Sequence, residues 1–158
     1  MKKGFVALLS ALVGAGIGVA GDSYFKSKII SKNNERVNKF KSYYNILNQW
    51  LVLLHEGKNI EQYFKKNQYH KIAIYGMGEI GNRLYEELKD SSIEVAYAID
   101  KNAGSAYAHL EVYSLEDEFE EVDAIVVTTA FAFEEIKDKL ENKINCPIIS
   151  LEDVVFEV

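Results

Sequence analysis

The stretch that decides the fold is "IAIYGMGEIGNRLYEEL", residues 72–88. Its first four residues are apolar, and such a short run predicts a buried strand. A turn rich in glycine follows. Leu84 and Leu88 then recur at helical spacing, which predicts a helix with one face packed on a sheet. The stretch therefore indicates a strand, turn and helix unit of an α/β fold.

Three glycines in this turn have the spacing of a phosphate-binding loop. Gly76 permits the tight turn, Gly78 leaves space for a phosphate beside the backbone, and Gly81 allows close packing of helix and sheet. The unpaired N–H groups at the start of the helix would then face the anion. Glu79 weakens the case for a bound phosphate, because a carboxylate at the helix start competes for the same N–H groups.

Other candidate ligand-binding residues stand at the ends of later strands. Asp100 lies nineteen residues after Gly81, where an acidic residue accepts ribose hydroxyls; the alternative is a turn residue. Thr128 and Thr129 end the fourth predicted strand, and equally suit ordinary strand positions. The predicted binding residues are Gly76, Met77, Gly78, Glu79, Ile80, Gly81, Asp100, Lys101, Thr128 and Thr129.

The same alternation of apolar runs and helical patterns continues to the end of the chain. It predicts an α/β fold with a single Rossmann-like parallel sheet of about five strands over residues 58–158, holding one mononucleotide-binding half. The predicted strands are 71–75, 93–99, 110–113, 123–128 and 147–149. The predicted helices are 79–89, 114–120 and 133–142, followed by a helical turn at 151–155 that Ser150 caps.

Residues 1–21 are predicted to be a transmembrane anchor. The eighteen residues from Gly4 to Gly21 carry no charge, and as a helix they would extend about 27 Å, close to the thickness of the bilayer core. The alternative is a cleaved signal peptide, with Lys2 and Lys3 ahead of the apolar run and small residues at 18–20. Six Lys and Arg residues at 26–41 follow the run. They favour an anchor with a single span and a cytoplasmic C-terminal side.

Residues 22–57 are predicted to form a basic juxtamembrane segment and a long amphipathic helix that Gly57 ends. One face repeats every seven residues, at Ile30, Val37, Tyr44 and Leu51, and then at Asn33, Phe40, Leu47 and Leu54. This face would suit a coiled coil, and with small residues spaced along the anchor it would allow a homodimer. The alternative packs Tyr43, Trp50 and Leu53 against the following domain, which so many aromatic residues favour.

Charge and composition exclude several classes of function. Residues 1–42 hold eight Lys and Arg against two acids, whereas residues 43–158 hold ten against twenty-two. A domain this acidic is a poor partner for nucleic acid. The single cysteine, Cys146, and three histidines have no metal-ligand spacing. The sequence contains no serine elbow, and none of its Tyr-Lys pairs stands where catalysis would need it.

The segment "KIAIYGMGEIGNRLYEELKDSSIEVAYAIDKN", residues 71–102, resembles a known domain family. This is the small Rossmann domain, often called CoA-binding-like, of bacterial polysaccharide-biosynthesis proteins such as membrane-bound nucleoside-diphosphate-sugar dehydratases and sugar transferases. Glu79 in the loop and Asp100 at the strand end both fit it. The resemblance implies nucleotide or nucleotide-sugar binding, on the cytoplasmic side of a bacterial membrane.

From these features we expect an accessory or regulatory module that binds NAD(P) or a nucleotide-sugar in cell-surface polysaccharide biosynthesis. One alternative is an enzyme dependent on NAD(P), or modifying a nucleotide-sugar, that a partner or an oligomer completes. A third is a scaffold whose glycine loop stays empty.

Overall fold

The computed structural model describes the backbone of residues 2–101, 103 and 110–158, and the side chains of 26–101, 103 and 110–158. The chain forms two compact units, Met1–Phe40 and Lys41–Val158. Helix α1 (Lys2–His55) runs from the first into the second. Among the described residues, no helix has the length and apolar character needed to cross a membrane. The anchor predicted within residues 1–21 lies outside the described side chains.

A five-stranded sheet forms the centre of the second unit. It consists of β1 (Lys71–Tyr75), β2 (Glu94–Ile99), β3 (Val112–Tyr113), β4 (Ala124–Val127) and β5 (Ile148–Ser150). Every pairing is parallel and the order is β3-β2-β1-β4-β5. This confirms the predicted parallel α/β sheet. The number of strands agrees with the five that were predicted, and β4 and β5 lie on the far side of β1 from β2.

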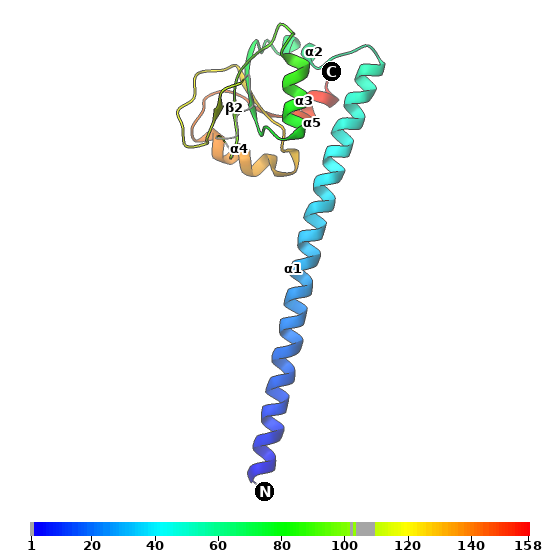
Figure 1. Cartoon of the computed structure of the whole chain (residues 1–158), viewed down its shortest axis with the longest axis vertical. Helices are drawn as coiled ribbons and strands as arrows, with labels where there is room; N and C mark the ends of the chain where they lie inside the picture. Colours follow the sequence, from blue (N-terminus) through cyan, green and yellow to red (C-terminus); the bar gives the residue numbers. More distant parts are fainter. Residues whose placement is uncertain (1, 102, 104–109) are drawn as a thin grey trace. The chain divides into compact units, whose positions relative to one another are not determined.

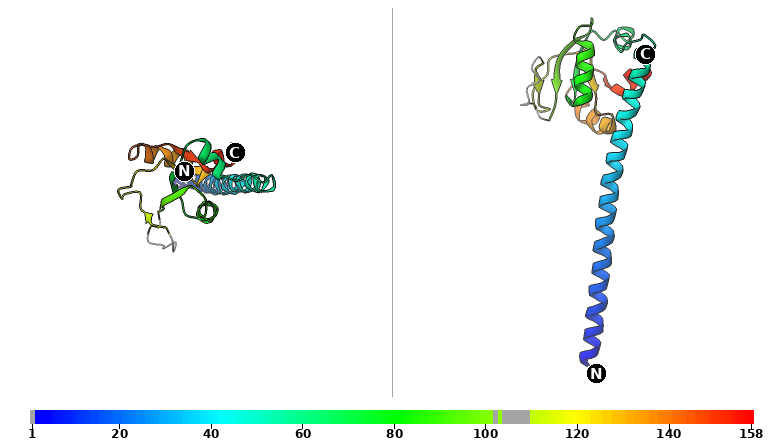
Figure 2. Two further views of the ribbon diagram at one scale, coloured as in Figure 1. Left: turned by 90° about the horizontal axis from the view of Figure 1, so that it is seen from above. Right: turned by 45° about the vertical axis from the view of Figure 1, so that its right-hand side comes forward.

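Helices cover both faces of the sheet (Figures 1 and 2). After α1 come α2 (Glu61–Lys66), α3 (Glu79–Leu88), the short 3₁₀ helix η1 (Ala130–Ala132), α4 (Phe133–Glu141) and α5 (Leu151–Phe156). The helices predicted at 79–89 and 133–142 are confirmed. The cap predicted for the helical turn at 151–155 is also confirmed, because Ser150 Oγ accepts a hydrogen bond from Glu152 N at 3.2 Å.

The helix predicted at 114–120 was wrong. Residues 114–117 form a turn, in which Asp117 N donates to Ser114 O at 3.1 Å and Ser114 N donates to Asp117 Oδ2 at 2.7 Å. The chain beyond the turn brings Phe119 onto the sheet, where its ring stacks on Tyr97 with 5.9 Å between centroids. Local side-chain bonds and this aromatic contact replace the helix.

The hydrophobic core has one layer on each side of the sheet. Residues of α3, α5, α2 and the end of α1 pack on one face, together with the inward side chains of β1 and β4. Residues of α4 and of the 113–122 segment pack on the other face. The strand residues alternate between the layers, as Ile72 and Ile74 do against Ala73 and Tyr75. The sheet is therefore buried on both sides, as parallel sheets are.

The end of α1 belongs to this core. Ile46, Trp50 and Leu53 are buried, and Trp50 Nε1 donates a hydrogen bond to Glu87 on α3. The expected packing of the amphipathic helix on the domain is thus confirmed. Gly57, with φ of +70°, ends helix α1 as predicted. Lys58 N donates a hydrogen bond to Leu53 O at 2.9 Å in a Schellman motif.

Candidate functional site

The candidate site lies at the carboxyl ends of β1 and β4. The chain passes from β1 to β2 on one side, whereas β4 lies on the other side of β1. In open parallel sheets, the connections diverge at such a switch point and leave a crevice there. The glycine loop follows β1, and η1 follows β4 after Thr128 and Thr129.

Each of the three glycines has a different surrounding. Gly76 has φ of +94°, and its N–H donates to Ile99 O at 2.8 Å. A Cβ built on Gly81 would lie 2.0 Å from Gly76 O, so helix and loop are in direct contact. A Cβ built on Gly78 would meet no atom within 4 Å. The arrangement agrees with the roles expected of the three glycines, including open space at the second.

Helix α3 starts at this open space. Gly78 is its N-cap residue, and no side-chain hydrogen bond caps the helix there. The first N–H groups of a helix have no partner within the helix and carry a partial positive charge. They are therefore available to an anion beside Gly78. Glu79 is exposed, and its charge acts on Tyr43, whose pKa is raised by burial and then by Glu79.

Three side chains hold the loop in shape. Asp100 Oδ2 accepts a hydrogen bond from Met77 N at 2.7 Å. Thr128 Oγ1 donates to Gly76 O at 2.7 Å and is itself buried. Asn82 Nδ2 donates to Gly78 O at 3.0 Å and to Met77 O at 3.2 Å. Asp100 and Thr128 thus have a role in fixing the loop, beside the ligand contacts predicted for them.

A cavity of about 320 Å³ opens at this end of the sheet. Its size is at the lower end of the range for small-molecule sites, enough for part of a nucleotide. Four of the predicted residues line it, namely Gly76, Asp100, Lys101 and Thr129. Six further residues complete the lining: Tyr75, Phe131, Ala132, Glu135, Ile136 and Lys139.

The other six predicted residues do not line the cavity. The side chains of Met77 and Ile80 are buried in the core layer that α3 forms with the sheet, and the N–H of Met77 is already bonded to Asp100. Gly78 and Glu79 are exposed at the helix start, and Gly81 is buried against the loop. The structure therefore divides the predicted set into a helix start, a cavity lining and a structural support.

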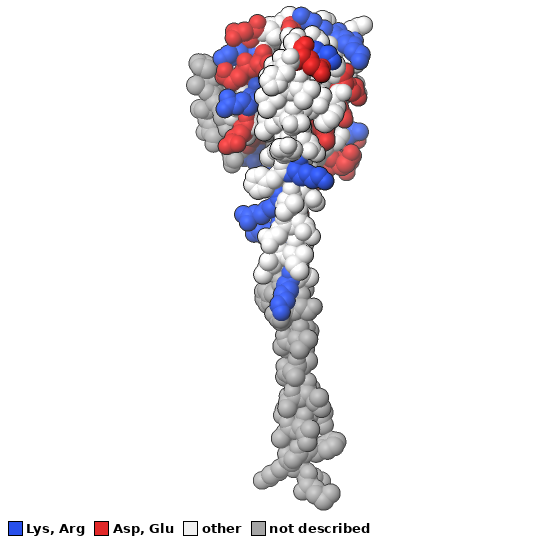
Figure 3. Space-filling view, turned by 90° about the vertical axis from the view of Figure 1, so that its right-hand side faces the viewer, with Lys and Arg blue, Asp and Glu red and all other residues white. Residues whose placement is uncertain are grey.

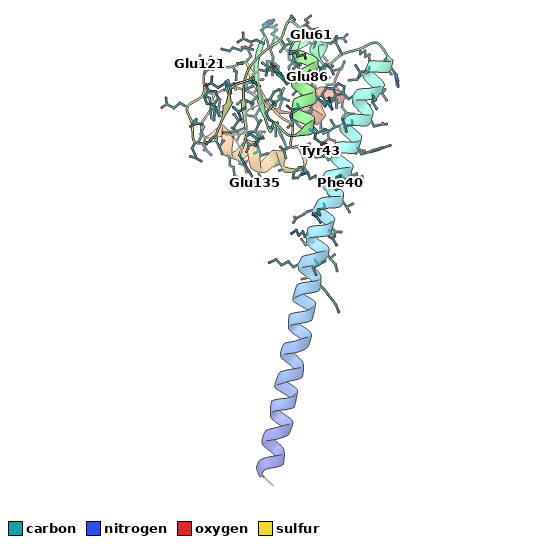
Figure 4. The ribbon with its side chains drawn as sticks, viewed as in Figure 1. Phe40, Tyr43, Glu61, Glu86, Glu121 and Glu135 are labelled. Carbon is teal, nitrogen blue, oxygen red and sulfur yellow. The ribbon has the colours of Figure 1, made fainter. Side chains whose placement is uncertain are left out.

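The cavity lining combines both signs of charge. Glu135, on α4 (Figure 4), forms an ion pair with Lys139. A hydrogen bond from Lys139 is the main reason that the pKa of Glu135 is lowered, and the charge of Lys101 adds to it. Burial raises the pKa of Tyr75, and the charges of Asp100 and Glu135 raise it further while Lys139 opposes them. Tyr75 therefore presents a neutral phenol.

Such a lining suits binding of a polar ligand with an anionic part. Lysine ammonium groups attract phosphate, while carboxylates and the Thr129 hydroxyl accept hydrogen bonds from sugar hydroxyls. Among the described residues, no group of three or more His, Cys, Asp or Glu side chains is placed to hold a metal ion.

The sequence pattern did not indicate Tyr75, Phe131, Glu135, Lys139 or Asn82 as parts of the site. Tyr75 reads as the last residue of a strand, and Glu135 with Lys139 reads as an ordinary exposed helix pair. Only the parallel order of the strands brings these residues beside Asp100. Phe131 had a usable signal, since a large apolar residue four positions after the end of β4 is placed near the ligand edge of the sheet.

The sheet and the crevice define a parallel α/β protein whose strand order is compatible with a Rossmann-like fold. The family model described as "C2185-like, N-terminal" matches residues 68–148, and the chain belongs to this C2185-like family. The match begins just before β1 and reaches into β5. Neither the curated proteins nor the solved structures contained a match to the chain.

Proposed function

We propose that this chain is a nucleotide-binding or nucleotide-sugar-binding module, accessory or regulatory in cell-surface polysaccharide biosynthesis. The observation that carries the proposal is the open space at Gly78, next to a helix start without a side-chain cap. A diphosphate placed there would accept hydrogen bonds from backbone N–H groups of α3 and would meet the positive end of the helix dipole.

The rest of the ligand would extend along the cavity between β1 and β4. Asp100 would accept bonds from ribose hydroxyls with the oxygen atoms of its carboxylate, while it also holds the loop through Met77 N. The phenol of Tyr75, Thr129 and the charged pair Glu135 and Lys139 would contact the distal group. NAD(P) and nucleotide-sugars each carry a diphosphate and sugar hydroxyls, so both suit this arrangement.

We further propose that residues 1–21 anchor the chain in the bacterial cell membrane with a single span, and that the sheet unit lies in the cytoplasm. This part rests on the uncharged run from Gly4 to Gly21 and on the basic residues that follow it. The resemblance of the loop to that of membrane-bound polysaccharide-biosynthesis proteins supports both the location and the biological setting.

Thermal unfolding of the full chain in mild detergent tests ligand binding. We expect one of NAD(H), NADP(H), CoA or a UDP-sugar to raise Tm, because a ligand at a hundred times its Kd stabilises the folded state by about 2.7 kcal/mol. For a chain of this size that corresponds to roughly 5–10 °C.

The Gly78→Leu variant locates the site. Its Cβ would meet no atom within 4 Å and the rest of the side chain would occupy the open space, so we expect the unliganded Tm to change little and the shift by the ligand to disappear. Glu86→Leu, on the exposed face of the same helix, is the matched control and should keep the shift. If none of these ligands raises Tm, the loop is empty and the scaffold alternative holds. A shift that survives Gly78→Leu would place the ligand elsewhere.

A further inference from the structure

Helix α1 exposes a stripe of large apolar side chains in the Lys41–Val158 unit. Tyr44, Leu47, Leu51 and Leu54 are 68%, 40%, 56% and 51% exposed. The adjoining face of the same helix is buried against the sheet unit. In Figure 3 the surface over this part of α1 is a continuous area without charged side chains, bordered by charged ones. The domain therefore covers one face of α1 and leaves a second apolar face in water.

The Met1–Phe40 unit has its own part of such a stripe. Ile30, Val37 and Phe40 are 58%, 62% and 71% exposed, and Asn33 is exposed as well. These positions continue the same seven-residue repeat along one unbroken helix. We call the repeat the α1 seam: Ile30, Asn33, Val37, Phe40, Tyr44, Leu47, Leu51 and Leu54.

We propose that the α1 seam binds the α1 seam of a second copy of this chain, as a parallel two-stranded coiled coil. A seam with apolar residues at seven of its eight a and d positions has the length that such pairing requires. Its seven apolar side chains are 40–71% exposed, so pairing would remove a large contiguous apolar surface from water. The seam is separate from the crevice, so the inference does not rest on nucleotide binding.

The spacing of the seam favours a second copy over an unrelated partner. An apolar period of 3.5 residues fits a partner helix with the same period, and an identical chain supplies it in register. Asn33, the one polar residue of the seam, favours the parallel direction. In a parallel pair it meets the Asn33 of the other copy, and the two amides can bond to each other. In an antiparallel pair it would face Leu51, and its amide would be buried without a partner.

The folded domain is compatible with this pairing. Tyr43 and Trp50 flank the seam on the side where α1 packs on its own domain. Tyr43 contacts the ring of Phe131 there, with 6.0 Å between centroids. On the opposite flank stand Lys41 and Asn48, which are exposed. A two-fold pair would place the two domains on opposite sides of the coiled coil, so each domain leaves the Tyr44, Leu47, Leu51 and Leu54 side chains of its own unit accessible.

Charge predicts how the dimer responds to salt. In a parallel pair, Arg36 of one copy lies beside Lys41 of the other, because these positions flank the seam five residues apart. These two positive charges repel each other across the pair, and added salt screens the repulsion. The apolar seam is unaffected or strengthened by salt. We therefore expect tighter dimerisation at high ionic strength.

Disulfide trapping in the full chain tests the direction and register. In a Cys146→Ser background, Val37→Cys and Leu51→Cys each place a thiol on the seam, and Glu35→Cys places one on the exposed far side of the same helix. We expect oxidation to link both seam variants into covalent dimers at least about fivefold more than the Glu35→Cys control, since only the seam positions bring thiols within reach. Equal linking at all three positions, or none at Val37 and Leu51, would overturn the proposal.

Light scattering in mild detergent measures the mass without any cross-link. The wild-type protein part should be twice 17.9 kDa, and higher salt should lower the dissociation constant. Phe40→Glu with Leu47→Glu should give a monomer that keeps its helical circular dichroism. Ser31→Glu with Asn38→Glu adds the same charge away from the seam and should leave the dimer intact. A wild-type monomer, or equal dissociation in both double variants, would refute self-association through the seam.

Discussion

At the scale of single residues, Gly78 and Gly81 stand at the same helix start and differ in the space around them. The Cβ of an alanine at 81 would lie 2.0 Å from Gly76 O and 3.1 Å from Gly76 C, both backbone atoms. Loop and helix must then separate. We expect Gly81→Ala to lower the free energy of unfolding by about 2–3 kcal/mol, which urea titration followed by circular dichroism would measure.

Gly78→Ala is the matched control for that substitution. Its φ of −72° and ψ of −165° suit alanine, and its Cβ meets nothing within 4 Å. We expect the free energy of unfolding to change by no more than about 0.5 kcal/mol. Equal losses for the two variants would show that the loop and α3 are not in close contact as described.

Some contacts of single residues in the candidate site were predictable from the sequence, and others were not. The glycine spacing predicted both the turn at Gly76 and the close packing at Gly81, because these are local demands of the backbone. The sequence did not predict the hydrogen bond from Met77 N to Asp100. Nor did it predict that Glu135 and Lys139 line the cavity. They depend on which strands become neighbours, and no local pattern encodes that.

At the scale of elements, Glu87 on α3 fastens α1 and the start of α2 to the domain. Its carboxylate accepts hydrogen bonds from Trp50 Nε1 and, at 3.3 Å, from Ile60 N. Trp50 is 5% exposed, so its N–H has little access to water once Glu87 is removed. We expect Glu87→Ala to cost about 1–3 kcal/mol of unfolding free energy, measured by denaturant titration.

The neighbouring acid on the same helix supplies the control for Glu87. Glu86 is exposed and pairs with Lys89 one turn on, so we expect Glu86→Ala to change stability by less than about 0.5 kcal/mol. Glu87→Gln should retain part of the stability, since an amide oxygen still accepts one of the two bonds. A cost for Glu86→Ala as large as that for Glu87→Ala would contradict this account.

Glu61 connects α2 to the turn before β2, and this connection should depend on pH. Hydrogen bonds from Lys65 and then from Ser92 lower the pKa of Glu61 to about 2. A carboxylate with a lowered pKa stabilises the folded state above its unfolded pKa, and that contribution is lost as pH falls toward the folded pKa. We therefore expect Glu61→Gln to be less stable than wild type at about pH 7, and the gap to close between about pH 5 and 2.

Denaturant titrations of both proteins across this pH range would measure the gap. It should also shrink with salt, because the Glu61–Lys65 pair is largely exposed on the lysine side. A gap that stayed constant from neutral to acid pH would show that the ionised form of Glu61 contributes nothing to the contact with Ser92.

The elements differ in how well the sequence predicted them. Residues 71–75 formed a strand with the predicted limits, because a continuous apolar run between polar and glycine residues has few other uses in a parallel sheet. The helix predicted at 114–120 was wrong, since Ser114 and Asp117 bond to each other's backbone, and Phe119 gains a ring contact with Tyr97. Short polar segments are decided by such tertiary contacts more than by propensity.

At the scale of the whole molecule, α1 has two apolar faces, of which one packs on the domain and the other is exposed. The sequence presented coiled coil and domain packing as alternatives. Trp50 and Leu53 pack on the domain, yet Leu51 and Leu54 stay exposed on the adjoining face. A helix turns 100° per residue, so one helix can serve both surfaces. The two alternatives are therefore not mutually exclusive: domain packing is confirmed and the coiled coil stays a proposal. A sequence pattern alone does not show which faces of a helix are already covered.

The anchor proposed at residues 1–21 makes a prediction for the full chain in bacterial cells. We expect the protein in the membrane fraction, resistant to high salt and alkaline carbonate and released by detergent. Leu9→Lys with Val13→Lys should move it to the soluble fraction, because each lysine near the centre of a span costs about 2.5–3.5 kcal/mol. Ser31→Lys with Asn34→Lys adds the same charge beyond the apolar run and should leave the protein in the membrane. Wild type that is released by salt alone would refute the anchor, and an intact mass lacking the first twenty residues would establish the signal peptide instead.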